Sequence, residues 1–199
     1  KLMVMCHLFY KDKDIIFVDN NSENRENNII FAPTLTVEDV VFMFRYYKEV
    51  YILSDDPQKA FNIFTSHLKR IEAAGGVVAS DEDEVLMIKR NGRWDIPKGK
   101  REIGEDMPTC AVREVQEECG IGALECGDLI CITNHIYQIG KNWVVKPTSW
   151  YHMKNKGAKE QLKPQTEEGI EIVEWVKIND LSEKTKESYS TIKHVIRNL

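Results

Sequence analysis

The sequence contains no run of apolar residues long enough to cross a membrane, and it contains no C-x-x-C pair of cysteines. The first absence excludes a membrane-spanning helix, and the second excludes the common zinc-ribbon and dithiol motifs. Hydrophobic residues make up 42% of the 199 residues and charged residues 30%, which is enough apolar material for an ordinary globular core. The length fits one large domain, or one domain with a small extension.

Cysteine is scarce, and its spacing suggests no pairing. Five cysteines are an odd number, which favours free thiols in a reducing cytoplasm over a framework of disulfides. They are Cys6, Cys110, Cys119, Cys126 and Cys131. The short apolar start is followed at once by the charged residues 11–14, which is unlike a secretory signal peptide. We therefore expect a cytoplasmic protein.

The sequence also has no excess of positive charge. Lys and Arg number 27 against 32 Asp and Glu, and the formal net charge is −5. A protein that binds nucleic acid through a broad basic surface has the opposite balance. We expect neither a nucleic-acid partner nor a membrane partner, and a homodimer is among the assemblies left open.

Residues 1–70 alternate between short apolar stretches and polar turns, which predicts a small α+β subdomain. Its expected elements are strands at 2–10, 15–19 and 51–54, a polar loop at 20–28, and helices at 37–49 and 57–70. Thr36 is the expected N-cap of the first helix, and Asp56-Pro57 opens the second. The role of this segment is open between an accessory domain, a lid and a dimerisation element.

Residues 72–199 have a different pattern, with strands around one central helix and a helical end. The expected elements are strands at 73–79, 85–88, 124–137, 143–153 and 170–177, a helix between Asp106 and Gly120, a polar loop at 155–169, and helix in 181–199. Asp106 suits an N-cap, Pro108 the first helical turn, and Gly120 the position past the end. The central helix is thus about three turns long.

Glu114, Glu117 and Glu118 fall on one face of this helix, because they are three and four residues apart. A different face carries apolar residues that can pack on a core, namely Ala111, Val112, Val115 and Cys119. Three neighbouring carboxylates repel one another, so the pattern indicates a bound cation. Oxygen ligands in this number suit Mg²⁺ or Mn²⁺.

Further residues stand at fixed distances from the three glutamates. Residues 99–121 fit the pattern G-x5-E-x7-R-E-U-x-E-E-x-G-U, in which U is a bulky aliphatic residue. Its fixed positions are Gly99, Glu105, Arg113, Glu114, Glu117, Glu118 and Gly120, with Val115 and Ile121 as the aliphatic ones. A merely solvated acidic helix does not explain these offsets. The segment resembles the Nudix box without a departure.

The resemblance implies a fold and a chemistry. The fold is α/β: a Nudix α/β/α sandwich with a mixed sheet over residues 72–199, preceded by the small subdomain at 1–70. The reaction is hydrolysis of a nucleoside diphosphate linked to another moiety, with Mg²⁺ or Mn²⁺ as cofactor and a nucleotide-type molecule as substrate. By resemblance, Glu114, Glu117 and Glu118 bind the metal directly, and Gly99 adds its carbonyl oxygen.

The resemblance also gives roles to residues around the metal. Glu105 and Arg113 match positions that pair with each other or orient the ligands. The general base is either a glutamate of the box, such as Glu114, or a glutamate of a distant loop. Glu168, in the polar loop before the strand at 170–177, is the distant candidate, although a solvated acidic turn explains it equally well.

The substrate is indicated by weaker signals. The run Trp94 to Gly99 resembles the W-x-x-P-K-G of Nudix hydrolases that act on dinucleoside polyphosphates, and Lys98 is the expected substrate-binding cation. Tyr137, sixteen residues past Ile121, resembles an adenine-stacking position, with a structural role as the alternative. A dinucleoside polyphosphate such as diadenosine tetraphosphate is the first expectation. ADP-ribose or a nucleoside diphosphate sugar is the alternative, followed by a non-catalytic nucleotide sensor.

Overall fold

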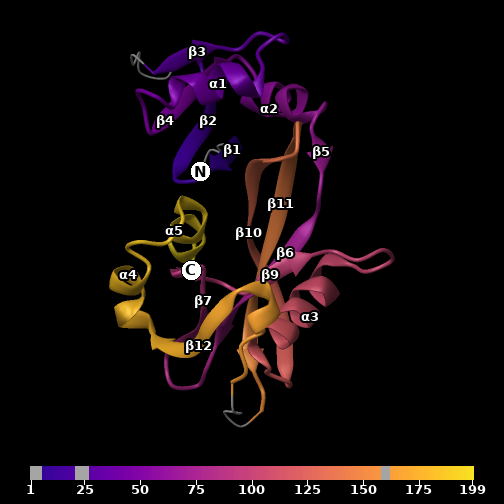
Figure 1. Cartoon of the computed structure of the whole chain (residues 1–199), viewed down its shortest axis with the longest axis vertical. Helices are drawn as coiled ribbons and strands as arrows, with labels where there is room; N and C mark the ends of the chain where they lie inside the picture. Colours follow the sequence, from indigo (N-terminus) through magenta and orange to yellow (C-terminus); the bar gives the residue numbers. More distant parts are fainter. Residues whose placement is uncertain (1–5, 21–26, 158–161) are drawn as a thin grey trace. The chain divides into compact units, whose positions relative to one another are not determined.

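The computed structural model describes residues 6–20, 27–157 and 162–199 (Figure 1). The chain groups into two compact units, the first formed by Lys1–Arg70 with Asn134–Lys146 and the second by Ile71–Thr133 with Pro147–Leu199. The sequence did not indicate that residues 134–146 belong with the N-terminal segment. Whether the two units are the separate domains expected at 1–70 and 72–199 stays a prediction. Within the described residues, no helix combines the length and the apolar character that crossing a membrane requires.

The sheet of the first unit starts from a hairpin. β1 (Cys6–Tyr10) and β2 (Lys13–Asp19) are antiparallel, as expected. β4 (Glu49–Ser54) lies parallel to β2, and β3 (Asn28–Ile30) lies parallel to β4. Two long strands, β10 (Leu124–Ile139) and β11 (Asn142–Asn155), follow each other in the chain, and the ends at which they are joined belong to this unit. There β10 pairs with β1, and β11 pairs with β5 (Lys69–Arg70). β3 was not predicted.

The two helices of the first unit begin where the sequence places them but end early. α1 (Val37–Met43) is capped by Thr36, and α2 (Pro57–Thr65) is capped by Asp56. The expected extensions to residues 49 and 70 are wrong. The Lys13 ammonium donates to the Phe44 and Tyr47 carbonyls past α1, and the Thr65 and Ser66 hydroxyls donate back to carbonyls of α2. These side chains satisfy the helix ends, so the chain can turn there.

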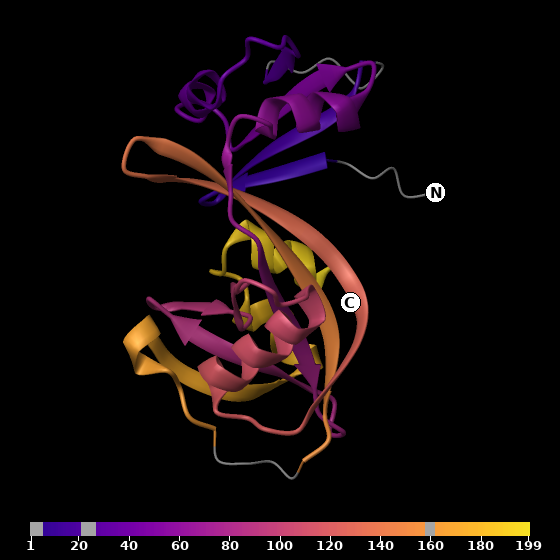
Figure 2. The same ribbon diagram turned by 90° about the vertical axis from the view of Figure 1, so that its right-hand side faces the viewer.

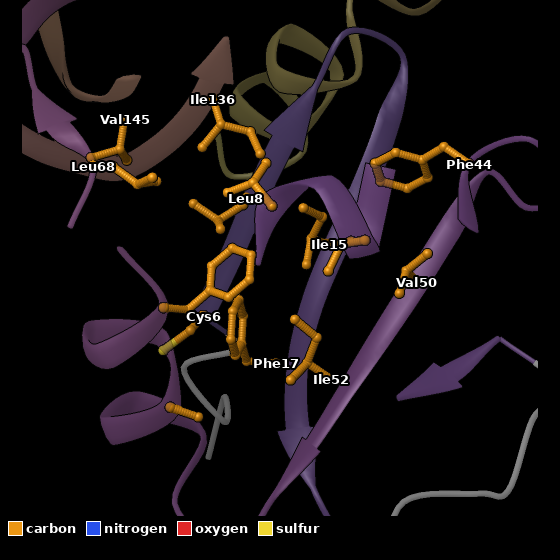
Figure 3. Close-up of a cluster of buried hydrophobic side chains, with 14 residues drawn as sticks. Cys6, Leu8, Ile15, Phe17, Phe44, Val50, Ile52, Leu68, Ile136 and Val145 are labelled. Carbon is orange, nitrogen blue, oxygen red and sulfur yellow. The ribbon is translucent and has the colours of Figure 1, made fainter. Parts of the chain in front are cut away.

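One apolar cluster holds the first unit together (Figure 3). It joins β1, β2 and β4 to the inner faces of α1 and α2, with Leu8, Ile15, Phe17 and Ile52 fully buried. Ile136 and Val145 enter the same cluster from β10 and β11 (Figure 3). The first unit therefore depends on a stretch of chain that is distant in sequence.

The second unit is a mixed sheet between two helical layers. The strand order is β12 (Ile170–Lys177), β7 (Glu84–Arg90), β6 (Ala73–Ala79), β11 and β10. β12 and β6 are antiparallel to β7, and β11 is parallel to β6. The short β8 (Arg93–Asp95) and β9 (Lys98–Lys100) pair with β7 and β6. Figure 2 shows β10 and β11 as one long hairpin.

Alternating residues of the strands face the two layers. Leu86 and Ile88 pack against α3 (Met107–Cys119), whereas Val85 and Met87 pack against the C-terminal helices. These helices are α4 (Leu181–Lys184) and α5 (Ser190–Ile196), on the other side of the sheet from α3 (Figure 1). Because side chains alternate between the two faces of a strand, β7 contributes residues to the apolar clusters on both sides of the sheet. The expected α/β/α sandwich is confirmed.

The C-terminal segment differs from the expected continuous helix over 181–199. A 3₁₀ turn, η2 (Ile178–Asp180), leads into α4, and residues 185–189 separate α4 from α5. The Thr185 hydroxyl donates to the Leu181 carbonyl, and the Ser188 hydroxyl donates to the Trp94 carbonyl at 2.6 Å. Both residues are buried, so these hydroxyls replace helical hydrogen bonds with local and tertiary ones.

Other expectations are met or lie partly outside the described residues. The strands at 73–79, 85–88, 124–137, 143–153 and 170–177 are present, and the two long ones extend by about two residues. Of the expected strand at 2–10 and the loops at 20–28 and 155–169, residues 2–5, 21–26 and 158–161 lie outside the described ranges. A 3₁₀ turn, η1 (Thr166–Glu168), lies in the last of these loops. All five cysteines are free thiols.

Gly120 supplies a test of the α3 end. Its φ is +67°, and an added Cβ would lie 2.7 Å from the Lys163 Cβ. We expect Gly120→Ala to lower the free energy of unfolding by at least about 1–2 kcal/mol, the cost of a left-handed residue with a Cβ. Gly104→Ala is the matched control, because its φ is +84° but nothing lies within 4 Å. Denaturant unfolding should show the larger loss for Gly120→Ala, and an equal loss would contradict the contact with Lys163.

Candidate active site

α3 carries the site, and its bounds are those that the sequence predicts. The Asp106 carboxylate accepts a hydrogen bond from the Thr109 amide at 2.8 Å, and Gly120 ends the helix in the left-handed conformation. The apolar face is fully buried: Cys110, Ala111, Val115 and Cys119 have no exposed area. The apolar face packs the helix against the sheet, and this packing fixes the orientation of the glutamates on its other face.

The three glutamates of α3 differ in burial. Glu118 is 0% exposed and Glu114 is 8% exposed, whereas the Glu117 side chain is 51% exposed. Two of the three predicted metal-binding carboxylates are thus shielded from solvent by neighbouring residues. A carboxylate out of water needs charged or hydrogen-bonding partners, and these partners define the rest of the site.

Gly99 is the first neighbour. β9 holds it opposite Ala74, and a Cβ built on Gly99 would lie 1.8 Å from the Glu114 Oε2 atom. The Glu114 carboxylate occupies the place that any side chain at position 99 would fill. The glycine is required by this close approach, since its φ is not positive.

Glu118 has two partners outside its helix. Its Oε2 accepts the Lys98 amide at 2.9 Å, and its Oε1 lies 3.5 Å from Nη1 of Arg90. Burial raises the pKa of Glu118 to about 7, although the charge and the amide of Lys98 and the charge of Arg90 act in the opposite direction. Burial likewise raises the pKa of Glu114, against the effect of Arg113. In both residues burial outweighs the positive charge nearby, because burial disfavours the charged form of a carboxylate.

Arg113 joins the loop before α3 to the glutamates on it. Its Nε and Nη2 donate to the two oxygens of Glu105 at 2.8 and 3.0 Å, and its Nη1 donates to Glu114 at 2.8 Å and Glu117 at 3.1 Å. Hydrogen bonding to Arg113 lowers the pKa of Glu105 to about 2. The pairing of Glu105 with Arg113 is present as the resemblance implied. That it orients metal ligands stays a prediction.

Lys98 is held rather than free. Its ammonium lies 2.6 Å from Oδ2 of Asp95, which is 5% exposed, and 3.4 Å from the Ile96 carbonyl. Asp95 Oδ1 in turn accepts the Ile96 amide at 2.8 Å. The side chain of Lys98 is thus held by Asp95, and its amide is held by Glu118. Substrate binding by Lys98 stays a prediction.

Glu168 is brought to the same group, whereas Tyr137 belongs to the first unit. Glu168 lies at the end of η1, and its Oε2 accepts a hydrogen bond from Nη2 of Arg90 at 3.1 Å. Tyr137 is part of the first unit, where its ring centroid lies 5.6 Å from that of His135. The predicted adenine-stacking role of Tyr137 stays a prediction, as does the predicted role of Glu168 as a base.

Two residues of the site were not singled out from the sequence. Arg90 contacts both Glu118 and Glu168, and Asp95 anchors Lys98. A local signal existed for each. Asn91-Gly92 predicts a tight hairpin turn, which places Arg90 at a strand end. Asp95 is a charged residue between Trp94 and Ile96, where burial requires a partner.

The residues around Glu118 fit a divalent cation. Within residues 6–20, 27–157 and 162–199, no three His, Cys, Asp or Glu side chains already form a metal-binding group. The carboxylates of Glu114, Glu117 and Glu118 are held instead by Arg113 and Arg90. The potential ligands among these side chains are all carboxylate oxygens, and Gly99 leaves room for one of these carboxylates. Such oxygen ligands suit a hard ion such as Mg²⁺ or Mn²⁺.

Comparison with known proteins agrees with this fold and site. A model of the NUDIX domain matches residues 69–199, and the chain therefore belongs to the NUDIX family. The crystal structure of a MutT NUDIX hydrolase from Burkholderia pseudomallei superposes with a TM-score of 0.51, at 21% identity over 66% of this chain and 98% of that one. At that identity the likeness concerns the fold.

Two curated relatives match shorter segments. The mRNA-decapping enzyme subunit 2 of Arabidopsis thaliana is 35% identical over 63 residues, which are 30% of this chain and 17% of the plant protein. The 8-oxo-dGTP diphosphatase of Proteus vulgaris is 33% identical over 64 residues, which are 29% of this chain and 57% of the bacterial protein. The match thus spans about half of one relative and a sixth of the other.

The Glu105–Arg113 pair gives a prediction about pH. The folded pKa of Glu105 is about 2 and its usual value is 4.5, so the pair stabilises the fold above pH 4.5 and this contribution is lost as the pH falls towards 2. Glu105→Gln should be less stable than the wild type at pH 7, and the difference should shrink below pH 4.5. Denaturant unfolding across this range measures it, with the exposed Glu102→Gln as control. A difference independent of pH would refute the pairing.

Proposed function

We propose that this protein is a metal-dependent pyrophosphohydrolase that cleaves a nucleoside diphosphate linked to another moiety. The observation that carries this proposal is the buried pair Glu114 and Glu118, with Glu117 beside them and Gly99 against them. Buried carboxylates need nearby positive charge, and a divalent cation would add to the charge that Arg113 and Arg90 supply. The name of the Proteus vulgaris relative, a nucleotide diphosphatase, agrees with this reaction class.

Glu114, Glu117, Glu118 and the Gly99 carbonyl would hold the ion. A bound Mg²⁺ or Mn²⁺ would neutralise negative charge that develops on the phosphate oxygens. Arg113 holds Glu114 and Glu117 from one side, and the Lys98 amide holds Glu118 from the other. The carboxylates are therefore oriented before any substrate arrives, which lowers the cost of assembling the site.

A carboxylate at the rim takes the proton from the attacking water. Glu168 is our first candidate for this base, because its side chain is 45% exposed and lies beside the group formed by Arg90 and Glu118. Glu114 is the competing candidate, but its carboxylate is held by Arg113 and packed against Gly99. An exposed carboxylate with one partner is more readily available to water than a packed one.

For the substrate we propose a dinucleoside polyphosphate such as diadenosine tetraphosphate. The support is the run Trp94 to Gly99, in which the Lys98 amide donates to the Glu118 carboxylate and the Lys98 ammonium pairs with Asp95. Lys98 would exchange Asp95 for a phosphate oxygen of a long, highly charged chain. ADP-ribose, a nucleoside diphosphate sugar and binding without catalysis are the other outcomes that the substrate test distinguishes.

The substrate test is product analysis with Mg²⁺ over diadenosine tetraphosphate, ADP-ribose and 8-oxo-dGTP. We expect diadenosine tetraphosphate to give the highest kcat/KM, with cleavage at a pyrophosphate bond and loss of activity when a chelator removes the ion. Faster cleavage of ADP-ribose would replace the substrate that we propose. Binding of these nucleotides without turnover would favour a sensor over an enzyme.

The metal-binding glutamates give a second prediction. Glu114→Gln, Glu117→Gln and Glu118→Gln should each lower kcat by about a hundredfold or more, since even residues that only support metal ligands account for 10–100-fold. Mg²⁺-dependent turnover measures the effect, and circular dichroism checks folding. Glu102→Gln, which changes an exposed glutamate of the preceding loop, should keep the wild-type rate. Wild-type turnover by any of the three variants would remove that residue from the site.

A further inference from the structure

Arg90, the last residue of β7, contacts two glutamates that come from different elements. Its Nη1 lies 3.5 Å from Oε1 of Glu118 on α3, and its Nη2 lies 3.1 Å from Oε2 of Glu168 on η1. A guanidinium is planar and rigid, so its two terminal nitrogens hold their partners in a fixed relation. The side chain of Arg90 thus bridges the buried Glu118 and the more exposed Glu168.

The backbone that follows Arg90 fixes the position of this side chain. Asn91 and Gly92 have φ values of +50° and +75°, as in the tight turns that join two antiparallel strands. The Asn91 amide donates to the Gly169 carbonyl at 3.4 Å, and the Gly92 amide donates to the Glu171 carboxylate at 2.8 Å. The turn that carries Arg90 is therefore attached to the segment that carries Glu168.

The Glu168 segment is attached at its other end to α3. The Lys163 amide donates to the Cys119 carbonyl at 2.9 Å, and the Gln165 amide donates to the Glu118 carbonyl at 3.2 Å. The Glu168 amide then donates to the Gln165 carbonyl at 3.1 Å. The backbone brings Glu168 close to Glu118, and the remaining freedom is that of the Glu168 side chain.

The Arg90–Glu168 ion pair orients the Glu168 carboxylate but adds little to the stability of the fold. The two side chains are 31% and 45% exposed, and ion pairs in water stabilise a fold only slightly. Glu118, by contrast, is fully buried, and its other carboxylate oxygen accepts the Lys98 amide. An arginine fixed by one buried carboxylate can orient a second, mobile one.

We propose that Arg90 is a positioning residue that holds the Glu168 carboxylate beside Glu118, where Glu168 acts on the attacking water. This inference rests on the proposed hydrolytic function. Arg90 acts through Glu168 and does not bind the substrate. Turnover therefore depends on Arg90 only as long as Glu168 is present.

Steady-state kinetics of a double-mutant cycle test this dependence. The variants are Arg90→Gln, Arg90→Lys, Glu168→Gln and the double variant Arg90→Gln/Glu168→Gln, assayed with Mg²⁺ and the nucleotide that the wild type cleaves. Arg90→Gln should lower kcat ten- to a hundredfold with KM within about twofold, as for residues that orient others. Arg90→Lys should recover part of kcat, and the double variant should be no slower than Glu168→Gln.

The matched control is Glu171→Gln. This change removes one carboxylate charge from the same segment but keeps an oxygen for the Gly92 amide, whereas the Arg90 guanidinium donates to Glu168. It should keep the wild-type kcat. A raised KM with unchanged kcat in Arg90→Gln would make Arg90 a substrate contact and overturn the proposal. So would a double variant whose loss is the product of the two single losses.

Crystal structures of the variants separate this inference from the proposed function. If the wild type cleaves no nucleotide, the hydrolytic function fails, and the position of the Glu168 side chain still reports on the role of Arg90. The Glu168 carboxylate should leave its place beside Glu118 in Arg90→Gln, because it loses its ion-pair partner, and should keep that place in Glu171→Gln. An unchanged Glu168 carboxylate in Arg90→Gln would overturn the positioning role.

Discussion

The guanidinium of Arg113 is the interaction on which the candidate site depends. One side chain binds both oxygens of Glu105 on the loop before α3, the Lys100 carbonyl on β9, and the carboxylates of Glu114 and Glu117 on α3. Its five donors lie in one plane, so the loop, the strand and the helix are held in a single geometry. Without this cation, Glu114 and Glu117 would lack a positive partner and would repel each other within one turn of α3. Arg113 thus orients two of the three helix glutamates before an ion binds.

Much of the fold could be predicted because its signals are local. The bounds of α3 follow from Asp106, Pro108 and Gly120, whose effects on a helix end need no distant partner. The two-sided sheet follows from the unbroken apolar run Val85 to Ile88 of β7, which predicts a strand that is buried on both faces. β3 and the break between α4 and α5 could not be predicted in the same way. β3 exists through its pairing with β4, and the break depends on the bond from Ser188 to the Trp94 carbonyl, 94 residues away.

The same distinction separates the parts of the candidate site. The three glutamates were found from spacing alone, because spacing determines which residues share a helix face. Arg90 and Asp95 were not found, since their importance depends on which carboxylate or amine each one meets in space. Lys98 shows both sides of this limit. It was singled out from the sequence as a substrate-binding cation, but its ion pair with the buried Asp95 is visible only in the folded structure.

The hairpin of β10 and β11 changes how the chain can be divided. Its connected end, Asn134–Lys146, belongs to the first unit and supplies Ile136 and Val145 to that unit's core. The chain therefore passes between the units three times, near residues 70, 133 and 146. A gene cut at residue 70 would give one fragment with an incomplete core and another that exposes apolar side chains to water. The N-terminal region is in this sense not an appendage, and any recombination that exchanges it must carry two separate stretches of sequence together.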